Sequence, residues 1–163
     1  GLRQFGVSIE IASAEEMRQF GAKLARGLDE RPFDRPVVIG LSGELGAGKT
    51  TLVAGLLASL GYSGPVRSPT YTLIEPYHVA GQDFYHCDLY RLQDPDELDD
   101  LGLRDLAAPG AVLLIEWPER AEGRLGEPDL TLRLEYLGDS RVVAATPATP
   151  AGAAQAGFLL DQG

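Results

Sequence analysis

The segment GELGAGKT, residues 43–50, combines the residue types that bind phosphate groups. It matches the pattern G-x-x-x-x-G-K-[ST] through Gly43, Gly48, Lys49 and Thr50. Glycines let a loop turn its backbone N–H groups toward an anion without a Cβ clash, and the start of the following helix adds partial positive charge. The pattern predicts a nucleoside triphosphate site made by a continuous run of residues: Gly43, Glu44, Leu45, Gly46, Ala47, Gly48, Lys49, Thr50 and Thr51.

A triphosphate site of this kind also needs magnesium and groups that hold it. The lysine of the motif reaches the β- and γ-phosphates, and the hydroxyl of the next residue can ligate Mg²⁺. Glu116 ends the apolar run at 112–115 and could supply a carboxylate from a neighbouring strand. We therefore expect Thr50 and Glu116 to hold Mg²⁺, although an exposed acid at a strand end is the plain alternative. Trp117 either packs beside the site or contacts the nucleotide.

A second polar segment, YHCDLYR at 85–91, lies in a stretch of strand-forming residues. Alternate residues of a strand share a face, so His86, Asp88 and Tyr90 lie together. One histidine and one acid are too few for a metal cage, so a structural role for His86 remains open. Asp88 beside a phosphate site could polarise water or support the magnesium shell, which makes Lys49, Asp88 and Glu116 the candidate catalytic residues. Arg91 could pair with Asp88, bind phosphate or contact a partner.

The surrounding sequence predicts the elements that would position these residues. Apolar runs at 37–42 and 111–117 are typical of buried parallel strands, and a capping box at 13–16 predicts a helix over 14–28. Further strands are expected at 5–12, 71–77 and 82–89, with a hairpin formed by 129–136 and 141–145. These elements predict an α/β fold: a P-loop NTPase-like, three-layer domain with a mixed, mostly parallel central sheet. We expect one domain at 1–146 and a mobile, alanine-rich C-terminal tail at 147–163.

Composition restricts the functional classes further. The net charge of −10 disfavours direct binding of a polyanion such as tRNA or DNA. A single cysteine, Cys87, excludes an intrachain disulfide and a cysteine-based zinc framework, which favours a reducing, cytoplasmic setting. No apolar run is long enough to span a membrane, so no membrane association is expected.

In this order, the motifs resemble those of the TsaE family of bacterial ATPases. The matching blocks span about residues 10–136 and are LSGELGAGKTTL (41–52), VRSPTYTLIEPY (66–77), YHCDLYRLQDPDEL (85–98), LGL (101–103) and LLIEWPER (113–120). Cys87 departs from the family pattern, in which an apolar residue such as Phe is common there. The alanine-rich end lies outside the resemblance.

The resemblance implies a Mg²⁺-dependent ATPase with low basal activity that serves the threonylcarbamoylation of adenosine 37 in tRNA. It implies two protein partners, TsaD and TsaB, with tRNA contacted only through their complex. Ser68, Pro69 and Thr70 would form a nucleotide-sensing switch. The other candidates for switching or partner contact are His86, Tyr90, Arg91 and Trp117.

Two other functional classes stay open on the sequence alone. A small-molecule P-loop kinase has a similar length but needs an acceptor pocket and, usually, an arginine-bearing lid, for which 118–126 is the candidate segment. A nucleotide-gated binding module without productive hydrolysis is the other. Phosphate release without an acceptor would identify the ATPase, and acceptor-dependent ADP formation would identify the kinase.

Overall fold

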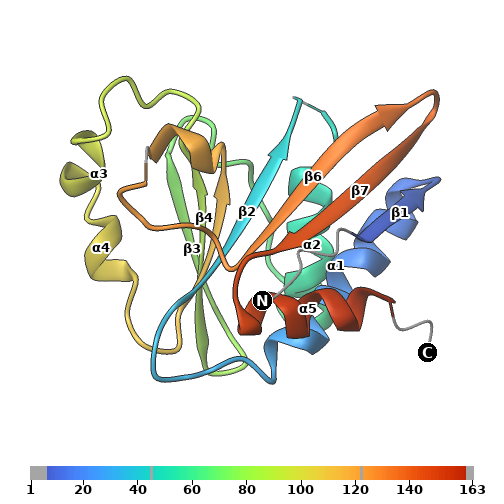
Figure 1. Cartoon of the computed structure of the whole chain (residues 1–163), viewed down its shortest axis with the longest axis horizontal. Coiled ribbons are helices and arrows are strands. Elements are labelled where there is room, and N and C mark those ends of the chain that lie inside the picture. The colour runs from blue at the N-terminus through green and yellow to red at the C-terminus, as the bar shows by residue number, and fades with distance from the viewer. Residues whose placement is uncertain (1–6, 45, 122, 161–163) are drawn as a thin grey trace.

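The computed structural model describes residues 7–44, 46–121 and 123–160 (Figure 1). Its strands are β1 (Val7–Ile11), β2 (Val37–Gly43), β3 (Ile74–Val79), β4 (Gln82–Asp88), β5 (Val112–Glu116), β6 (Leu130–Leu137) and β7 (Ser140–Pro147). Its helices are α1 (Ala14–Leu28), α2 (Lys49–Ser59), α3 (Glu97–Asp100), α4 (Leu103–Leu106) and α5 (Pro150–Leu160), with a 3₁₀ turn η1 (Pro118–Ala121).

The strands form one sheet in the order β1-β7-β6-β2-β5-β4-β3. The central pairs β6–β2, β2–β5 and β5–β4 are parallel, and the outer pairs β1–β7, β7–β6 and β4–β3 are antiparallel. The carboxyl ends of β2, β4, β5 and β6 consequently meet at one edge of the sheet, where ligands of open α/β sheets bind. The predicted α/β fold class with a mixed central sheet is confirmed.

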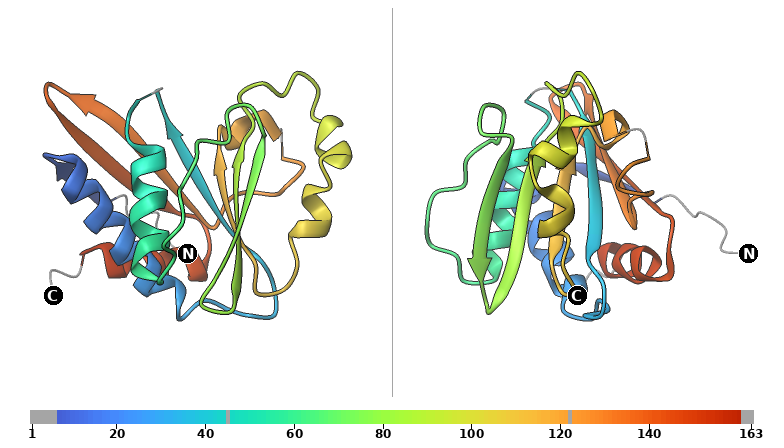
Figure 2. Two further views of the ribbon diagram at one scale, coloured as in Figure 1. Left: turned by 180° about the vertical axis from the view of Figure 1, so that it is seen from behind. Right: turned by 90° about the vertical axis from the view of Figure 1, so that its left-hand side faces the viewer.

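Helices cover both faces of this sheet. Phe84, Val112 and Leu114 belong to the core beneath α1 and α2, whereas Cys87, Leu113 and Ile115 belong to a second core beneath α3 and α4. Successive residues of a strand point to opposite faces, and both faces of β5 are covered, which is why its residues 112–115 are apolar without interruption. The two views of Figure 2 show the sheet between these helical layers.

The P-loop helix α2 lies unusually close to α1. A Cβ atom on Gly55 would lie 2.2 Å from the backbone oxygen of Arg18, and one on Gly21 would lie 2.1 Å from the backbone oxygen of Leu52. Only glycine fits at either position, because any side chain would enter the backbone of the other helix.

Two local predictions are wrong. The strand predicted from residue 71 begins only at Ile74, because residues 69–73 form a turn in which the Leu73 N–H donates to the Pro69 carbonyl at 2.8 Å and Leu73 has φ +70°. The tail predicted to be mobile from residue 147 instead contains α5, with Ala156 and Leu159 buried in the larger core. Alanine-rich composition also favours helix, and tertiary packing decides between the two outcomes.

Within 7–44, 46–121 and 123–160, no helix combines the length and the apolar character that crossing a bilayer requires.

Candidate functional site

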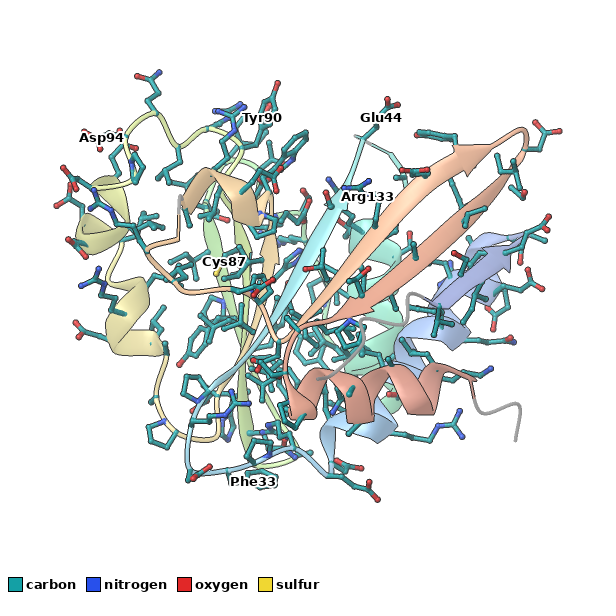
Figure 3. The ribbon with its side chains drawn as sticks, viewed as in Figure 1. Phe33, Glu44, Cys87, Tyr90, Asp94 and Arg133 are labelled. Carbon is teal, nitrogen blue, oxygen red and sulfur yellow. The ribbon has the colours of Figure 1, made fainter. Side chains whose placement is uncertain are left out.

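A cavity of about 500 Å³ opens at the edge where β2, β4 and β5 end. It is lined by residues from the P-loop, the loop before β3, and the ends of β4 and β5: Glu44, Gly46, Gly48, Lys49, Thr50, Thr51, Ser68, Thr70, Asp88, Tyr90, Arg91, Glu116 and Trp117. Figure 3 shows Glu44 and Tyr90 at this edge. Every lining residue belongs to the set singled out in the sequence, so segments distant in the chain meet in one place.

The P-loop has the backbone geometry that its glycines permit. Gly46 has φ +81° and Gly48, the N-cap of α2, has φ +111°, both in the left-handed region. The loop can therefore direct its N–H groups toward the start of α2. Ala47 is buried and does not line this cavity, although it lines a smaller one on the other side of the loop. Leu45 was predicted as part of the loop and lies outside the described residues.

Lys49 is buried, and its ammonium group is held by three neighbours. Its Nζ donates to the Gly43 carbonyl at 2.6 Å and lies 3.3 Å from Oε1 of Glu116. It also lies 5.4 Å from the centre of the Trp117 ring, within range of a cation–π interaction. The cation thus occupies the cavity floor, paired with a carboxylate of the same site.

Glu116 links this lysine to the histidine of β4. Its Oε2 is 2.7 Å from Nε2 of His86, a fully buried side chain behind the cavity wall. Burial raises the pKa of the Glu116 carboxyl, but the hydrogen bonds and charges of His86 and Lys49 together lower that pKa below its ordinary value. Glu116 is therefore an anion at neutral pH, available to a cation in the cavity.

Asp88 lies beside Glu116 on the adjacent parallel strand. The two residues are register partners, and Asp88 is 6% exposed. Its Oδ1 accepts a hydrogen bond from the backbone N–H of Tyr90 at 2.9 Å, which fixes the side chain at the end of β4. Two carboxylates from neighbouring strands thus border the same cavity.

Aromatic and arginine side chains form the rim of the cavity. The rings of Tyr90 and Trp117 lie 5.1 Å apart, and the guanidinium of Arg120 lies 5.4 Å from the Tyr90 ring. Arg91 lies 4.5 Å above the ring of Tyr71, and no ion pair joins it to Asp88, so the pairing considered from the sequence is not formed. Tyr71 was not singled out from the sequence, and Arg120 was considered only as part of the candidate lid at 118–126.

The backbone of Trp117 has an unusual conformation at the start of this rim. Its φ of +57° lies in the left-handed region, which a bulky residue rarely adopts. Its N–H donates to the Leu41 carbonyl at 3.2 Å, so the bend directly after Glu116 is tied to the neighbouring strand β2.

The predicted switch segment reaches the site along α2. Figure 2, left, shows the chain after α2 running back to the P-loop end of the sheet before β3 begins. Ser68 and Thr70 face the cavity with their hydroxyl oxygens 2.7 Å apart, while Pro69 is buried. The turn that follows is joined to β4, because the Asp88 N–H donates to the Leu73 carbonyl at 2.9 Å.

A second cavity of about 210 Å³ lies on the other side of the P-loop. Its lining shares Gly46, Gly48 and Thr51 with the first cavity and adds residues from α1 and the β6–β7 hairpin, among them Ser13, Met17, Asp139 and Arg141. Arg141 lies over the ring of Tyr136 at 4.1 Å. Asp139 and Arg141 could not be assigned to the site from the sequence, because the pairing of β6 with β2 is what brings the hairpin beside the P-loop.

The groups at the cavity suit a magnesium–phosphate complex better than a metal bound by protein alone. Within the described ranges, no three His, Cys, Asp or Glu side chains are grouped as a metal cage. Thr50 and Glu116 instead offer a hydroxyl and a carboxylate oxygen next to the P-loop. Mg²⁺ prefers few protein ligands and keeps water and phosphate oxygens in its shell, so these two residues fit it.

The only cysteine takes no part in this chemistry. Cys87 is buried in the core beneath α3 and α4, as Figure 3 shows, and burial raises the pKa of its thiol to about 12. The thiol therefore stays protonated and unreactive at neutral pH.

Comparison with known proteins gives consistent matches. The model of a family described as "Threonylcarbamoyl adenosine biosynthesis protein TsaE" matches residues 11–143. A protein of Haemophilus influenzae named tRNA threonylcarbamoyladenosine biosynthesis protein TsaE is 43% identical over 136 residues, 83% of this chain and 86% of its own. A Streptomyces coelicolor protein of the same name is 42% identical, covering 76% and 82%. The crystal structure of Bacillus subtilis YdiB aligns with a TM-score of 0.75 at 27% identity, covering 98% and 97%.

Proposed function

Because the chain belongs to the TsaE family, we propose that it acts in tRNA threonylcarbamoyladenosine biosynthesis as a Mg²⁺-dependent ATPase. The observation that carries this proposal is the convergence of Lys49, Thr50, Asp88 and Glu116 on one cavity at the carboxyl edge of the sheet. A phosphate-binding loop, a hydroxyl and two carboxylates are the groups that phosphoryl transfer from a nucleotide to water requires.

Each of these groups has a distinct task in the proposed reaction. Lys49 exchanges its contacts with Gly43 and Glu116 for the β- and γ-phosphates, and the P-loop N–H groups hold the same oxygens. Thr50 and Glu116 hold Mg²⁺, which when bound would neutralise charge that develops on the phosphates. Asp88, fixed by the Tyr90 N–H, orients the attacking water.

The nucleoside end of ATP would extend into the second cavity. That cavity shares Gly46, Gly48 and Thr51 with the phosphate site, so one ligand can cross the loop and occupy both. The face of Met17 and the guanidinium of Arg141 offer apolar and stacking contacts to a base.

The loop containing Ser68, Pro69 and Thr70 is proposed to sense the γ-phosphate. Few hydrogen bonds tie it to the sheet, so it can reorder without opening a core. We expect the amide hydrogen exchange of residues 66–72 to slow when a nonhydrolysable ATP analogue replaces ADP. Equal exchange in the two states would exclude a γ-phosphate sensor in this loop.

The proposed partners are the TsaD and TsaB proteins, with tRNA reached only through them. The exposed rim residues Tyr71, Tyr90 and Arg120 stand at the mouth of the cavity, where a docked protein could affect hydrolysis. Because of this role, we also propose that the protein acts in the cytoplasm.

A small-molecule kinase is the less favoured alternative, because its expected arginine-bearing lid does not reach the cavity. Neither arginine of the candidate lid lines the cavity: Arg120 stacks on the rim, and Arg124 pairs with Asp96 near α3. The candidate lid therefore supplies no arginine to the cavity, whereas a kinase would need one beside the transferred phosphoryl group.

The proposal is tested by ATP turnover with product analysis. Phosphate release is measured for the protein alone, with the two partners, and with partners and tRNA. Lys49→Met should abolish release, whereas Lys23→Met, at the only other lysine, should retain it. ADP formation that requires an acceptor molecule would identify a kinase instead, and turnover that survives Lys49→Met in a folded protein would exclude the P-loop site.

A further inference from the structure

The two oxygens of the Glu116 carboxylate have different partners. Oε1 lies 3.3 Å from the ammonium of Lys49 on the cavity floor, and Oε2 lies 2.7 Å from Nε2 of His86. His86 belongs to β4, and its side chain is fully buried, so it touches neither the cavity nor solvent. Of the two contacts, only that to Lys49 is open to exchange with a ligand.

The direction of the histidine bond follows from its acceptor. An ionised carboxylate only accepts hydrogen bonds, so Nε2 of His86 carries the hydrogen that is shared with Glu116. The other ring nitrogen, Nδ1, is buried and has no hydrogen-bond partner among the described residues. A buried polar atom without a partner is unfavourable, and an apolar side chain would avoid it. Packing alone therefore gives no reason for a histidine at this position.

We propose that His86 is a positioning residue for the magnesium ligand Glu116. By holding Oε2, it fixes the plane of the carboxylate and leaves Oε1 directed at the cavity, where this oxygen would be available to Mg²⁺ without rotation of the side chain. Groups that orient a metal ligand in this way affect metal affinity although they never touch the metal. The inference rests on the proposed function, since it assumes that Glu116 meets Mg²⁺.

The loss of this restraint has a defined consequence. Without the bond from His86, both oxygens of Glu116 can turn to Lys49, whose ammonium already lies 3.3 Å from Oε1. The lysine would then be held more firmly away from the phosphates, and the carboxylate would have to rotate before it could meet Mg²⁺. Both effects weaken Mg²⁺ binding in the nucleotide complex, and neither one requires a change in the fold.

The experiment compares three substitutions of His86. Glutamine can place an amide N–H near the position of Nε2, asparagine is too short to reach Glu116, and leucine fills the space without a donor. His78→Gln is the matched control, because this second histidine is exposed on β3 and pairs with Asp83. Thermal unfolding establishes which variants are folded. The main readout is the apparent Mg²⁺ dissociation constant in the presence of ADP, obtained by Mg²⁺ titration followed through tryptophan emission.

We expect His86→Leu and His86→Asn to weaken Mg²⁺ binding by about 10- to 100-fold, with His86→Gln within about threefold of the wild type. His78→Gln should leave the constant unchanged. If His86→Leu does not fold, the contrast between Gln and Asn decides, because both are polar and only one reaches the carboxylate. Equal Mg²⁺ affinity for these two variants overturns the inference, as does a folded His86→Leu with wild-type affinity.

The same titration separates this inference from the proposed function. If the wild-type protein binds ADP with no dependence on Mg²⁺, the proposed magnesium site fails, and the role of His86 fails with it. If the wild type depends on Mg²⁺ and every folded His86 variant shows the same dependence, only the positioning role is wrong.

Discussion

Replacing Lys49 by Met and Glu116 by Gln, singly and together, measures how strongly the nucleotide-free site holds its own cation. The charged atoms lie 3.3 Å apart, and the side chains are only 7% and 6% exposed. At an effective dielectric constant of about 20, this separation corresponds to an attraction of about 5 kcal/mol. Desolvation of both groups opposes the attraction, so the net coupling is smaller.

Each single substitution leaves one buried charge without the charge that faces it across the cavity floor, although Glu116 keeps its hydrogen bond with His86. We expect each to lower the free energy of unfolding by about 3 kcal/mol, because removing one member of a buried pair leaves the other uncompensated. The double variant should lose less than the sum of the two, with a coupling of about 2 kcal/mol. The assay is urea unfolding followed by circular dichroism at neutral pH without nucleotide.

The exposed pair Arg18–Glu15 on α1 is the matched control. Its atoms are 3.2 Å apart, almost the same distance, but the side chains are 51% and 67% exposed. The corresponding cycle, Arg18→Met with Glu15→Gln, should give a coupling of about 0.5 kcal/mol or less. If the Lys49–Glu116 cycle were additive within about 0.5 kcal/mol, the buried pair would not hold the lysine and the reasoning would be refuted.

Four further outcomes are expected. The only tryptophan, Trp117, lies over the lysine ammonium, so its emission should change when Mg²⁺–ADP draws that cation away; identical spectra would contradict this motion. Asp88→Asn should lower ATP turnover by about 10²-fold or more while nucleotide affinity changes little, whereas Arg91→Ala should reduce partner-stimulated turnover more than basal turnover. Since the folded-state pKa of Glu116 is lowered, its stabilising contribution is complete above about 4.5 and is lost as pH falls through the folded value. Glu116→Gln should therefore lose less stability than the wild type on acidification, as followed by urea unfolding.

The loop that forms the candidate phosphate site could be located from the sequence because its parts are local. The residues that turn the loop and present Lys49 are consecutive, and an apolar strand before them with a helix after them fixes their geometry. Glu116 was predicted for a related reason, since it ends the apolar run of a strand that reads as buried. Asp88 was predicted because alternation along the strand at 82–89 places it on one face with His86 and Tyr90. Parallel strands bring their carboxyl ends to one edge, so the meeting of these ends follows from element type alone.

Contacts that depend on the pairing register of the strands could not be predicted from the sequence. The contact of His86 with Glu116 requires β4 beside β5 in one particular register, which no local pattern specifies. Arg141 reaches the P-loop only because β6 pairs with β2. The helix α5 was missed because small apolar residues suit either a solvated segment or a helix, and its packing against α1, where Gln155 donates to the Gly27 carbonyl at 2.6 Å, decides the matter.

The near contact of backbones between α1 and α2 makes the two walls of the nucleotide cavity mechanically unequal. At Gly21 and Gly55 no side chain separates the helices, so the P-loop helix cannot recoil without displacing α1 and the core behind it. The opposite wall, residues 68–73, is held by a few hydrogen bonds and yields at much lower cost. Under the proposed function, the binding or loss of a γ-phosphate would therefore move residues 68–73 rather than α2. Under the proposed function, a partner that responds to the nucleotide would therefore contact the molecule on the side of Tyr71 and Tyr90 rather than on the side of α1.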